Sequence, residues 1–222
     1  MCIRDRIGIS VTNDPLGAYN AYSFSTPNFP DYPKYAITPE ALVVTTNEEG
    51  AGTLHQYFIN KAELAEGGAD ASIQRIAVPG AIGSEQGFIV STPVDLNGTN
   101  QPFDNNPIVI RLNDSSWANG PEQDGIELYT FEIDFDNVNN SQVVQTTIPT
   151  APFDAFPCSE TGFGFQCIPQ LNGGGLDGIP EVIMNVPHQR NFGSHESLVY
   201  SFVTDADNGA NRAGVRLSLI HI

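Results

Sequence analysis

Four reactive side chains lie within a nine-residue stretch near the C-terminal end of the sequence: His188, Arg190, His195 and Glu196. Such groups can line a carbohydrate or substrate pocket, in which Glu196 and a second acid would serve glycoside hydrolysis. The alternative is structural, with Arg190 pairing with Glu196 or a loop carbonyl and His195 simply beginning a strand. We take the four residues as a candidate ligand-binding set and assign no catalytic residue.

Two Asp-rich segments have the composition of single-loop calcium sites. Asp95 with Asn97, and Asp205 with Asp207, offer oxygen ligands at alternate positions. Arg216 stands where the second segment would need its last acidic ligand, so a full EF-hand is excluded. The same residue types are also typical of hairpin turns. Calcium is the one cofactor that the sequence suggests, and a turn is the competing interpretation.

Cys158 and Cys167 enclose a loop-like segment and are expected to form a disulfide in a secreted protein. The alternative is two reduced thiols, and zinc would require ligands beyond this pair. The sequence contains no Gly-x-Ser-x-Gly elbow, phosphate-binding loop or dinucleotide fingerprint.

The composition limits the partners. The 222 residues carry a formal net charge of −17, and such a surface repels nucleic-acid phosphates and anionic membranes. No apolar run is long enough to span a bilayer, so we expect no membrane insertion. Acidity combined with many Asn, Gly, Pro and Thr residues indicates an extracellular or cell-surface bacterial protein.

The two ends of the sequence are related to each other. Met1–Arg6 and Leu217–Ile222 can be encoded by DNA strings that are reverse complements and that resemble a transposon end used in sequencing libraries. We therefore expect residues 1–6 and 217–222 to be translated adapter, and residues 7–216 to be a fragment from a metagenomic source. On this expectation Cys2 and His221 belong to no native site.

Short apolar stretches between turn residues predict a chain of strands. The main predicted strands are 7–12, 19–25, 41–46, 54–59, 72–78, 88–92, 107–112, 127–136, 143–148, 181–186, 197–203 and 213–216. The alternation in 127–136 predicts a half-buried strand. One short helix is predicted between a capping Asn60 and a terminating Gly67. Groups of about four strands recur, as in the blades of a β-propeller, and a β-sandwich is the alternative.

Several segments also resemble one family. They are residues 14–17, 29–35, 94–99 and 128–135, and most specifically 190–199 followed by 213–216. Together they resemble large, uncharacterised secreted bacterial proteins with a β-propeller-like repeat domain, which often carry C-terminal sorting or adhesion modules. The resemblance covers nearly all of residues 7–216. It implies fold and location but no activity, and it implies further strands after residue 216.

These observations predict an incomplete β-propeller of about three four-stranded blades. The predicted function is a non-catalytic interaction module of an extracellular or cell-surface protein, with a glycan or a surface protein as its partner. The missing blades of the same chain would be a further partner. The alternative is part of a propeller-fold, glycoside hydrolase-like enzyme.

Overall fold

The computed structural model describes residues 4–48, 53–78, 80–81, 90–117, 120–157, 168–207 and 212–222. Within these residues the chain forms a two-stranded hairpin, three four-stranded sheets, one short α-helix and one 3-10 turn. The all-β class predicted from the sequence is therefore confirmed. No helix of the described residues is long and apolar enough to cross a membrane.

The strands are grouped by hydrogen bonding. The hairpin consists of β1 (Arg4–Ser10) and β2 (Tyr19–Ser25). The first sheet has the order β3 (Pro30–Ile37), β4 (Ala41–Glu48), β5 (His55–Asn60) and β6 (Ile73–Ala77). The second sheet has the order β7 (Thr92–Pro93), β9 (Ile108–Asn113), β10 (Gly125–Glu132) and β11 (Gln142–Pro149). The third sheet has the order β8 (Asp95–Asn97), β12 (His188–Asn191), β13 (Glu196–Asp205) and β14 (Ala213–His221).

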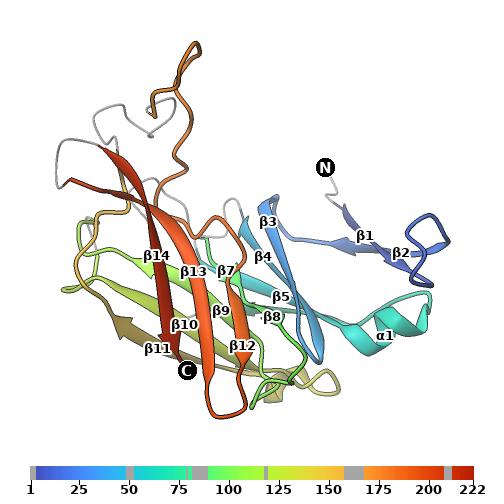
Figure 1. Cartoon of the computed structure of the whole chain (residues 1–222). Coiled ribbons are helices and arrows are strands. Elements are labelled where there is room, and N and C mark those ends of the chain that lie inside the picture. The colour runs from blue at the N-terminus through green and yellow to red at the C-terminus, as the bar shows by residue number, and fades with distance from the viewer. Residues whose placement is uncertain are drawn as a thin grey trace.

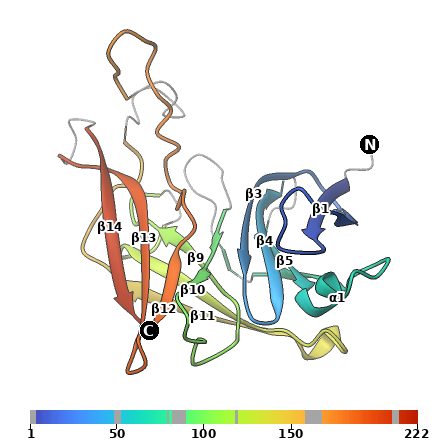
Figure 2. The same cartoon turned by 45° about the vertical axis from the view of Figure 1, so that its right-hand side comes forward.

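The hairpin and the three sheets stack face to face in chain order, from the blue hairpin to the orange and red third sheet (Figures 1 and 2). Three buried clusters fill the spaces between the layers. Tyr22 and Phe24 of the hairpin pack on Tyr57 and Ile59 of the first sheet. The other face of the first sheet packs through Val43 and Phe58 on Tyr129 and Phe131 of the second sheet. The opposite face of the second sheet packs through Ile110 and Leu128 on Leu198 and Tyr200 of the third.

The second and third sheets begin on one continuous stretch of chain. β7 pairs with β9 and β8 pairs with β12, and the two strands are separated only by Val94, whose side chain is buried between the sheets. β3 of the first sheet contacts both β7 and β8. The first strands of the three sheets therefore lie together, and the sheets spread from them. The pairing of β8 with β12 is parallel, and all other described strand pairs are antiparallel.

The predicted helix is confirmed as α1 (Lys61–Glu66). The side chain of Asn60 accepts the backbone N–H groups of Ala62 and Glu63, and Gly67 ends the helix with a φ of 75°. Leu64 is its buried residue, and the Tyr22 hydroxyl donates to the Leu64 carbonyl oxygen at 3.0 Å. This contact joins the helix to the hairpin.

Two features of the predicted strand 127–136 are wrong. The strand ends at Glu132, because the carboxylate of Asp134 accepts the backbone N–H groups of Asp136 and Asn137 and turns the chain into η1 (Val138–Asn140). It is also buried on both faces along most of its length, because it lies in a middle layer, with Leu128 facing the third sheet and Tyr129 the first.

The predicted strand 181–186 is also wrong, because this segment has no ladder partner. Glu181 has a φ of 66°, which strand geometry does not allow. Single hydrogen bonds hold the segment instead, from Glu181 N to Ala155 O and from the Thr92 hydroxyl to Ile183 O. Of the predicted strand 88–92, residues 88 and 89 lie outside the described part of the chain.

The described residues form three four-stranded sheets rather than the two sheets of a β-sandwich, and these sheets do not form a closed ring. Residues 217–221, part of the expected adapter segment, continue β14 beside β13, with Ser218 opposite Tyr200 and Ile220 opposite Leu198.

Candidate functional site

The outer face of the third sheet carries the predicted ligand-binding residues. Side chains alternate across a strand, so Leu198 and Tyr200 of β13 point to the second sheet and Val199 points away from it. His188 and Arg190 of β12 are exposed on this outer face, and Gln189 between them is buried. The strand period thus brings His188 and Arg190 to one surface.

The turn between β12 and β13 adds two rings to this surface. The Arg190 guanidinium lies 5.2 Å from the centre of the Phe192 ring, and Phe192 is stacked on His195 with centroids 5.1 Å apart. Phe192 is 51% exposed. The rings and the guanidinium therefore form a continuous platform that is open to solvent.

The segment after β8 packs under this platform. Gly98 has a φ of +98°, and a Cβ at this position would lie 3.4 Å from Nε of Arg190. Asn100 donates to the carbonyl oxygen of Asn191, and the Asn191 amide donates to that of Gln101. These contacts fix the segment against β12 and place Asn97 beside Arg190.

Together these residues line a pocket of about 360 Å³, here called the outer pocket. Its lining consists of Asn97, His188, Arg190, Phe192, His195 and Ser197, with Val199, Leu219 and His221 completing it. Ser197 Oγ lies 3.2 Å from Nδ1 of His221, and the rings of His195 and His221 are 5.2 Å apart. No Asp or Glu is among its described lining residues.

Glu196, the fourth predicted residue, does not reach the outer pocket. It is buried on the opposite face, where its carboxylate accepts the backbone N–H of Phe103 at 2.7 Å and the Gln189 amide at 3.0 Å. Among the described residues Arg190 pairs with neither of the two suggested structural partners: Glu196 is engaged elsewhere, and the Arg190 guanidinium lies over Phe192.

The predicted calcium ligands lie in different surroundings. Asp95 accepts the backbone N–H of Ile37, while Asn97 lines the outer pocket. Asp205 accepts the backbone N–H of Asp207, as in an ordinary turn. Among the described residues, no three His, Cys, Asp or Glu side chains gather in a way that could hold a metal ion. Cys158 and Cys167 lie outside the described residues.

Two buried carboxylates outside the set of residues predicted from the sequence have several hydrogen-bond partners each. Glu48 is bound by Arg75 at 2.9 Å, by the Tyr57 hydroxyl at 3.0 Å and by Asn28. Burial raises the pKa of Tyr57 to about 12, and burial together with the Arg75 charge lowers the pKa of His55 beside it. This network sits at the end of the first sheet and holds β4, β5 and β6 together.

The second carboxylate, Glu127, accepts hydrogen bonds from Tyr129, Asn113 and Gln145, with Arg111 Nε at 3.5 Å. Burial and the Glu127 hydrogen bond raise the pKa of Tyr129. Neither carboxylate lines a described pocket. We interpret both networks as structural, because a buried carboxylate needs such partners.

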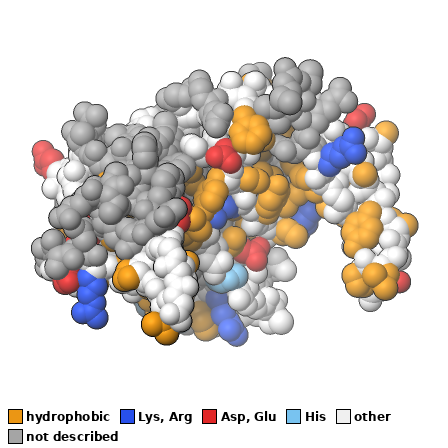
Figure 3. Space-filling view, turned by 90° about the horizontal axis from the view of Figure 1, so that it is seen from above, with side chains coloured by type: hydrophobic (Ala, Val, Ile, Leu, Met, Phe, Trp, Pro, Cys, Tyr) orange, Lys and Arg blue, Asp and Glu red, His pale blue; other side chains and the backbone are white. Residues whose placement is uncertain are grey.

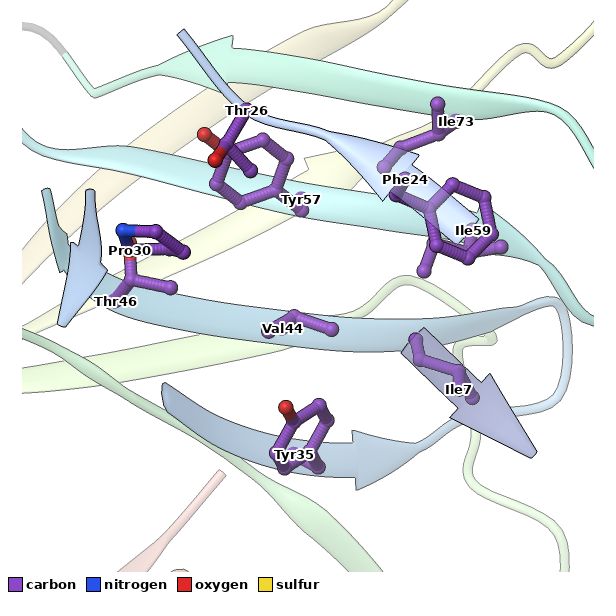
Figure 4. Close-up of a pocket in the computed structure, with 10 residues that line it drawn as sticks. All are labelled: Ile7, Phe24, Thr26, Pro30, Tyr35, Val44, Thr46, Tyr57, Ile59 and Ile73. Atoms are coloured by element: carbon purple, nitrogen blue, oxygen red, sulfur yellow. The ribbon is translucent and has the colours of Figure 1, made fainter. Parts of the chain in front are cut away.

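A narrow cavity lies within the contact between the hairpin and the first sheet (Figure 4). Ile7 and Phe24 cover it from the hairpin, and Val44, Tyr57 and Ile59 form its base on the sheet. Its volume is about 20 Å³, which is room for roughly one water molecule. The cavity is part of the packing between these two layers.

A wider groove lies between β1, β3 and the start of β12, lined by Ile9, Ile37, Asp95 and His188 among others. Seen from above, hydrophobic side chains gather in the middle of the molecule, with a histidine beside an acidic side chain next to them (Figure 3). His188 lines both this groove and the outer pocket.

Comparison with known proteins found no matching family model, no similar curated protein and no similar solved structure.

Proposed function

We propose that this chain is a non-catalytic binding module of a secreted or cell-surface protein and that the outer pocket binds a glycan. The supporting observation is the Phe192 ring, which is 51% exposed and lies beside Arg190 and His195, with the Asn97 amide in the same pocket. The exposed part of an aromatic ring gives the apolar C–H groups of a sugar a surface to contact. The amide, guanidinium and imidazole groups around it can hydrogen-bond to hydroxyl groups.

The absence of carboxylates from the described lining favours binding over hydrolysis. Most glycosidases need two carboxyl groups on either side of the bond that is cleaved, about 5–10 Å apart. The outer pocket offers none among its described residues, and Glu196 faces away from it. The glycoside hydrolase alternative is therefore less well supported.

The stacking of the sheets supports a finer proposal for the fold, in which the three sheets are consecutive blades of an incomplete propeller. Each sheet packs on the next, and β3, β7 and β8 lie together as inner strands would. Val203 and Val215 face outward at the end of the third sheet away from the outer pocket. We propose that a further sheet of the parent chain covers that end and leaves the pocket at its margin.

The proposal is tested by a glycan array with the purified chain and two variants. Phe192→Ala removes this apolar surface and is expected to abolish retention. Phe29→Ala removes a similarly exposed ring, 47% exposed, that does not line the outer pocket, and is expected to bind normally. Thermal unfolding of all three chains verifies that they fold equally. Absence of any retained glycan, or equal loss in both variants, would refute the proposal.

A further inference from the structure

The outer pocket differs in charge from the rest of the molecule. The chain has 26 acidic and only 9 Lys and Arg residues, yet the described lining contains Arg190 and histidines and no acidic side chain. Of the four histidines of the chain, His188 and His195 line this pocket, together with His221 of the expected adapter segment. On a strongly acidic protein, this selection of residues favours an anionic ligand.

Arg190 is the group that would meet such a ligand. Arg75 and Arg111 form ion pairs with the buried Glu48 and Glu127, whereas no described carboxylate pairs with Arg190. Its position is nevertheless defined, since Phe192 lies on one side and Gly98 on another. A positioned guanidinium presents a fork of N–H donors that matches the two oxygens of a carboxylate.

Two carboxylates on strands of the same sheet face elsewhere. Asp95, which is opposite His188 in the parallel pairing, accepts the backbone N–H of Ile37 and lines the groove rather than the pocket. Glu196 is buried on the other face of the sheet. Neither one therefore occupies the space in front of the Arg190 guanidinium.

We infer that the outer pocket selects sugars that carry a carboxylate, such as uronic acids, with Arg190 binding the carboxylate and the exposed part of Phe192 contacting the sugar ring. This inference rests on the proposed function. It does not depend on residues 217–222, because Asn97, His188, Arg190 and His195 supply the polar groups without Leu219 or His221. A pocket of about 360 Å³ is within the usual range for small ligands.

The test compares D-glucuronate with D-glucuronamide, which has the same shape without the charge. Both are titrated into the full chain while binding is followed by NMR. Glucuronate is expected to bind about tenfold more tightly or better, because hydrogen bonds to a charged group are the stronger ones. Raising the ionic strength is expected to reduce this preference.

Two variants locate the effect. Arg190→Gln is expected to remove the preference for glucuronate, while Arg212→Gln removes an equal charge from an exposed site outside the pocket and is expected to retain it. Replacing His221 and Leu219 by serine is expected to retain it as well.

Three other results would overturn the inference or the role of Arg190. Equal affinity for the acid and the amide overturns the inference and leaves glycan binding intact. An unchanged preference in Arg190→Gln overturns the role of Arg190. If neither sugar binds, the inference is overturned, and neutral glycans retained on the array would still support the proposed function.

Discussion

Adjacent threonines on β4 show how one residue step changes the role of a side chain. Thr45 points to one face of the first sheet, where its hydroxyl donates to the carbonyl oxygen of Ser91 at 2.8 Å. Thr46 points to the other face and lines the narrow cavity, and its hydroxyl is buried without a hydrogen-bond partner among the described residues. Valine has nearly the same shape as threonine, so the substitution at each position replaces the hydroxyl group with a methyl group of similar size.

We expect opposite effects from the two valine substitutions. Thr45→Val should lower the free energy of unfolding by about 1–2 kcal/mol, because a buried hydrogen bond is lost. Thr46→Val should raise it by up to about 1 kcal/mol, because an unsatisfied polar group is removed. Urea unfolding of the two variants and the unsubstituted chain measures both changes. Destabilisation by Thr46→Val equal to that of Thr45→Val would show that the Thr46 hydroxyl has a partner.

Tyr57 predicts how stability depends on alkaline pH. Its pKa is raised from 10.0 to about 12, chiefly by burial, so the folded state keeps the phenol proton at a pH where the unfolded state releases it. Stability should therefore be unaffected by this group below about pH 10 and should fall as the pH rises from 10 towards 12. Other tyrosines whose pKa is raised affect stability in the same direction. The contribution of Tyr57 is therefore the difference in the free energy of unfolding between the unsubstituted chain and Tyr57→Phe. Parallel stability curves for the two chains above pH 10 would contradict this assignment.

At the scale of elements, aspartates hold the segment that follows β11. Asp124 accepts the backbone N–H groups of Phe153 and Ser115, and the buried Asp114 accepts that of Ala155. Asp154 lies among them, and partial burial, followed by the charges of Asp114, Asp205 and Asp124, raises the pKa of its carboxyl. The same small region thus contains carboxylates that stabilise the fold and one whose charge opposes it.

Substitutions at Asp124 and Asp154 should therefore have opposite signs at neutral pH. Asp124→Ala leaves two N–H groups without their acceptor and should cost about 1–3 kcal/mol or more. Asp154→Asn keeps an oxygen for the N–H of Phe156 and should raise the melting temperature. Because the pKa of Asp154 is raised in the folded state, this gain is full above that pKa and disappears below the ordinary range of aspartate. Thermal unfolding between pH 3 and 8 tests both expectations, and a gain independent of pH would argue against an electrostatic origin.

Elements fixed by local chemistry were predictable from the sequence. The cap at Asn60 and the terminating Gly67 define α1 through neighbouring residues alone. β10 and β11 are also consecutive in the sequence and pair with each other, with Phe131 opposite Val143, although the bound at Glu132 depends on the turn at Asp134. The segment 181–186 was not predictable, because its apolar residues are buried by distant parts of the chain such as Thr92 and Ala155 rather than by a ladder.

In the outer pocket, too, some features follow from local sequence and others depend on distant parts of the chain. The period of a strand places His188 and Arg190 on one face, so this pair was predictable. The same alternation places the adjacent residues His195 and Glu196 on opposite faces of the sheet. The prediction that both line one pocket did not take this alternation into account. The contribution of Asn97 could not be foreseen, because it depends on the parallel pairing of β8 with β12 across a long stretch of sequence.

At the scale of the whole molecule, the layers formed by the described residues leave one broad sheet face uncovered by other described elements. Both faces of the first and second sheets are packed, whereas the outer face of the third sheet exposes Val215, Leu217 and Leu219 by 77%, 73% and 57%. Contiguous apolar surface of this kind, beside the exposed edge of β14, promotes association. Leu217 and Leu219 belong to the expected adapter segment, while Val215 does not.

We therefore expect the purified chain to self-associate through this face, and sedimentation velocity at increasing protein concentration measures it. Val215→Lys should shift the distribution towards monomer, because it buries a charge in any contact between two such faces. Serine at both Leu217 and Leu219 should weaken association further. Val144→Lys is the matched control, since Val144 is 56% exposed on β11 and lies outside this face. A monomeric chain at all concentrations, or equal effects of Val215→Lys and Val144→Lys, would show that the uncovered face does not drive association.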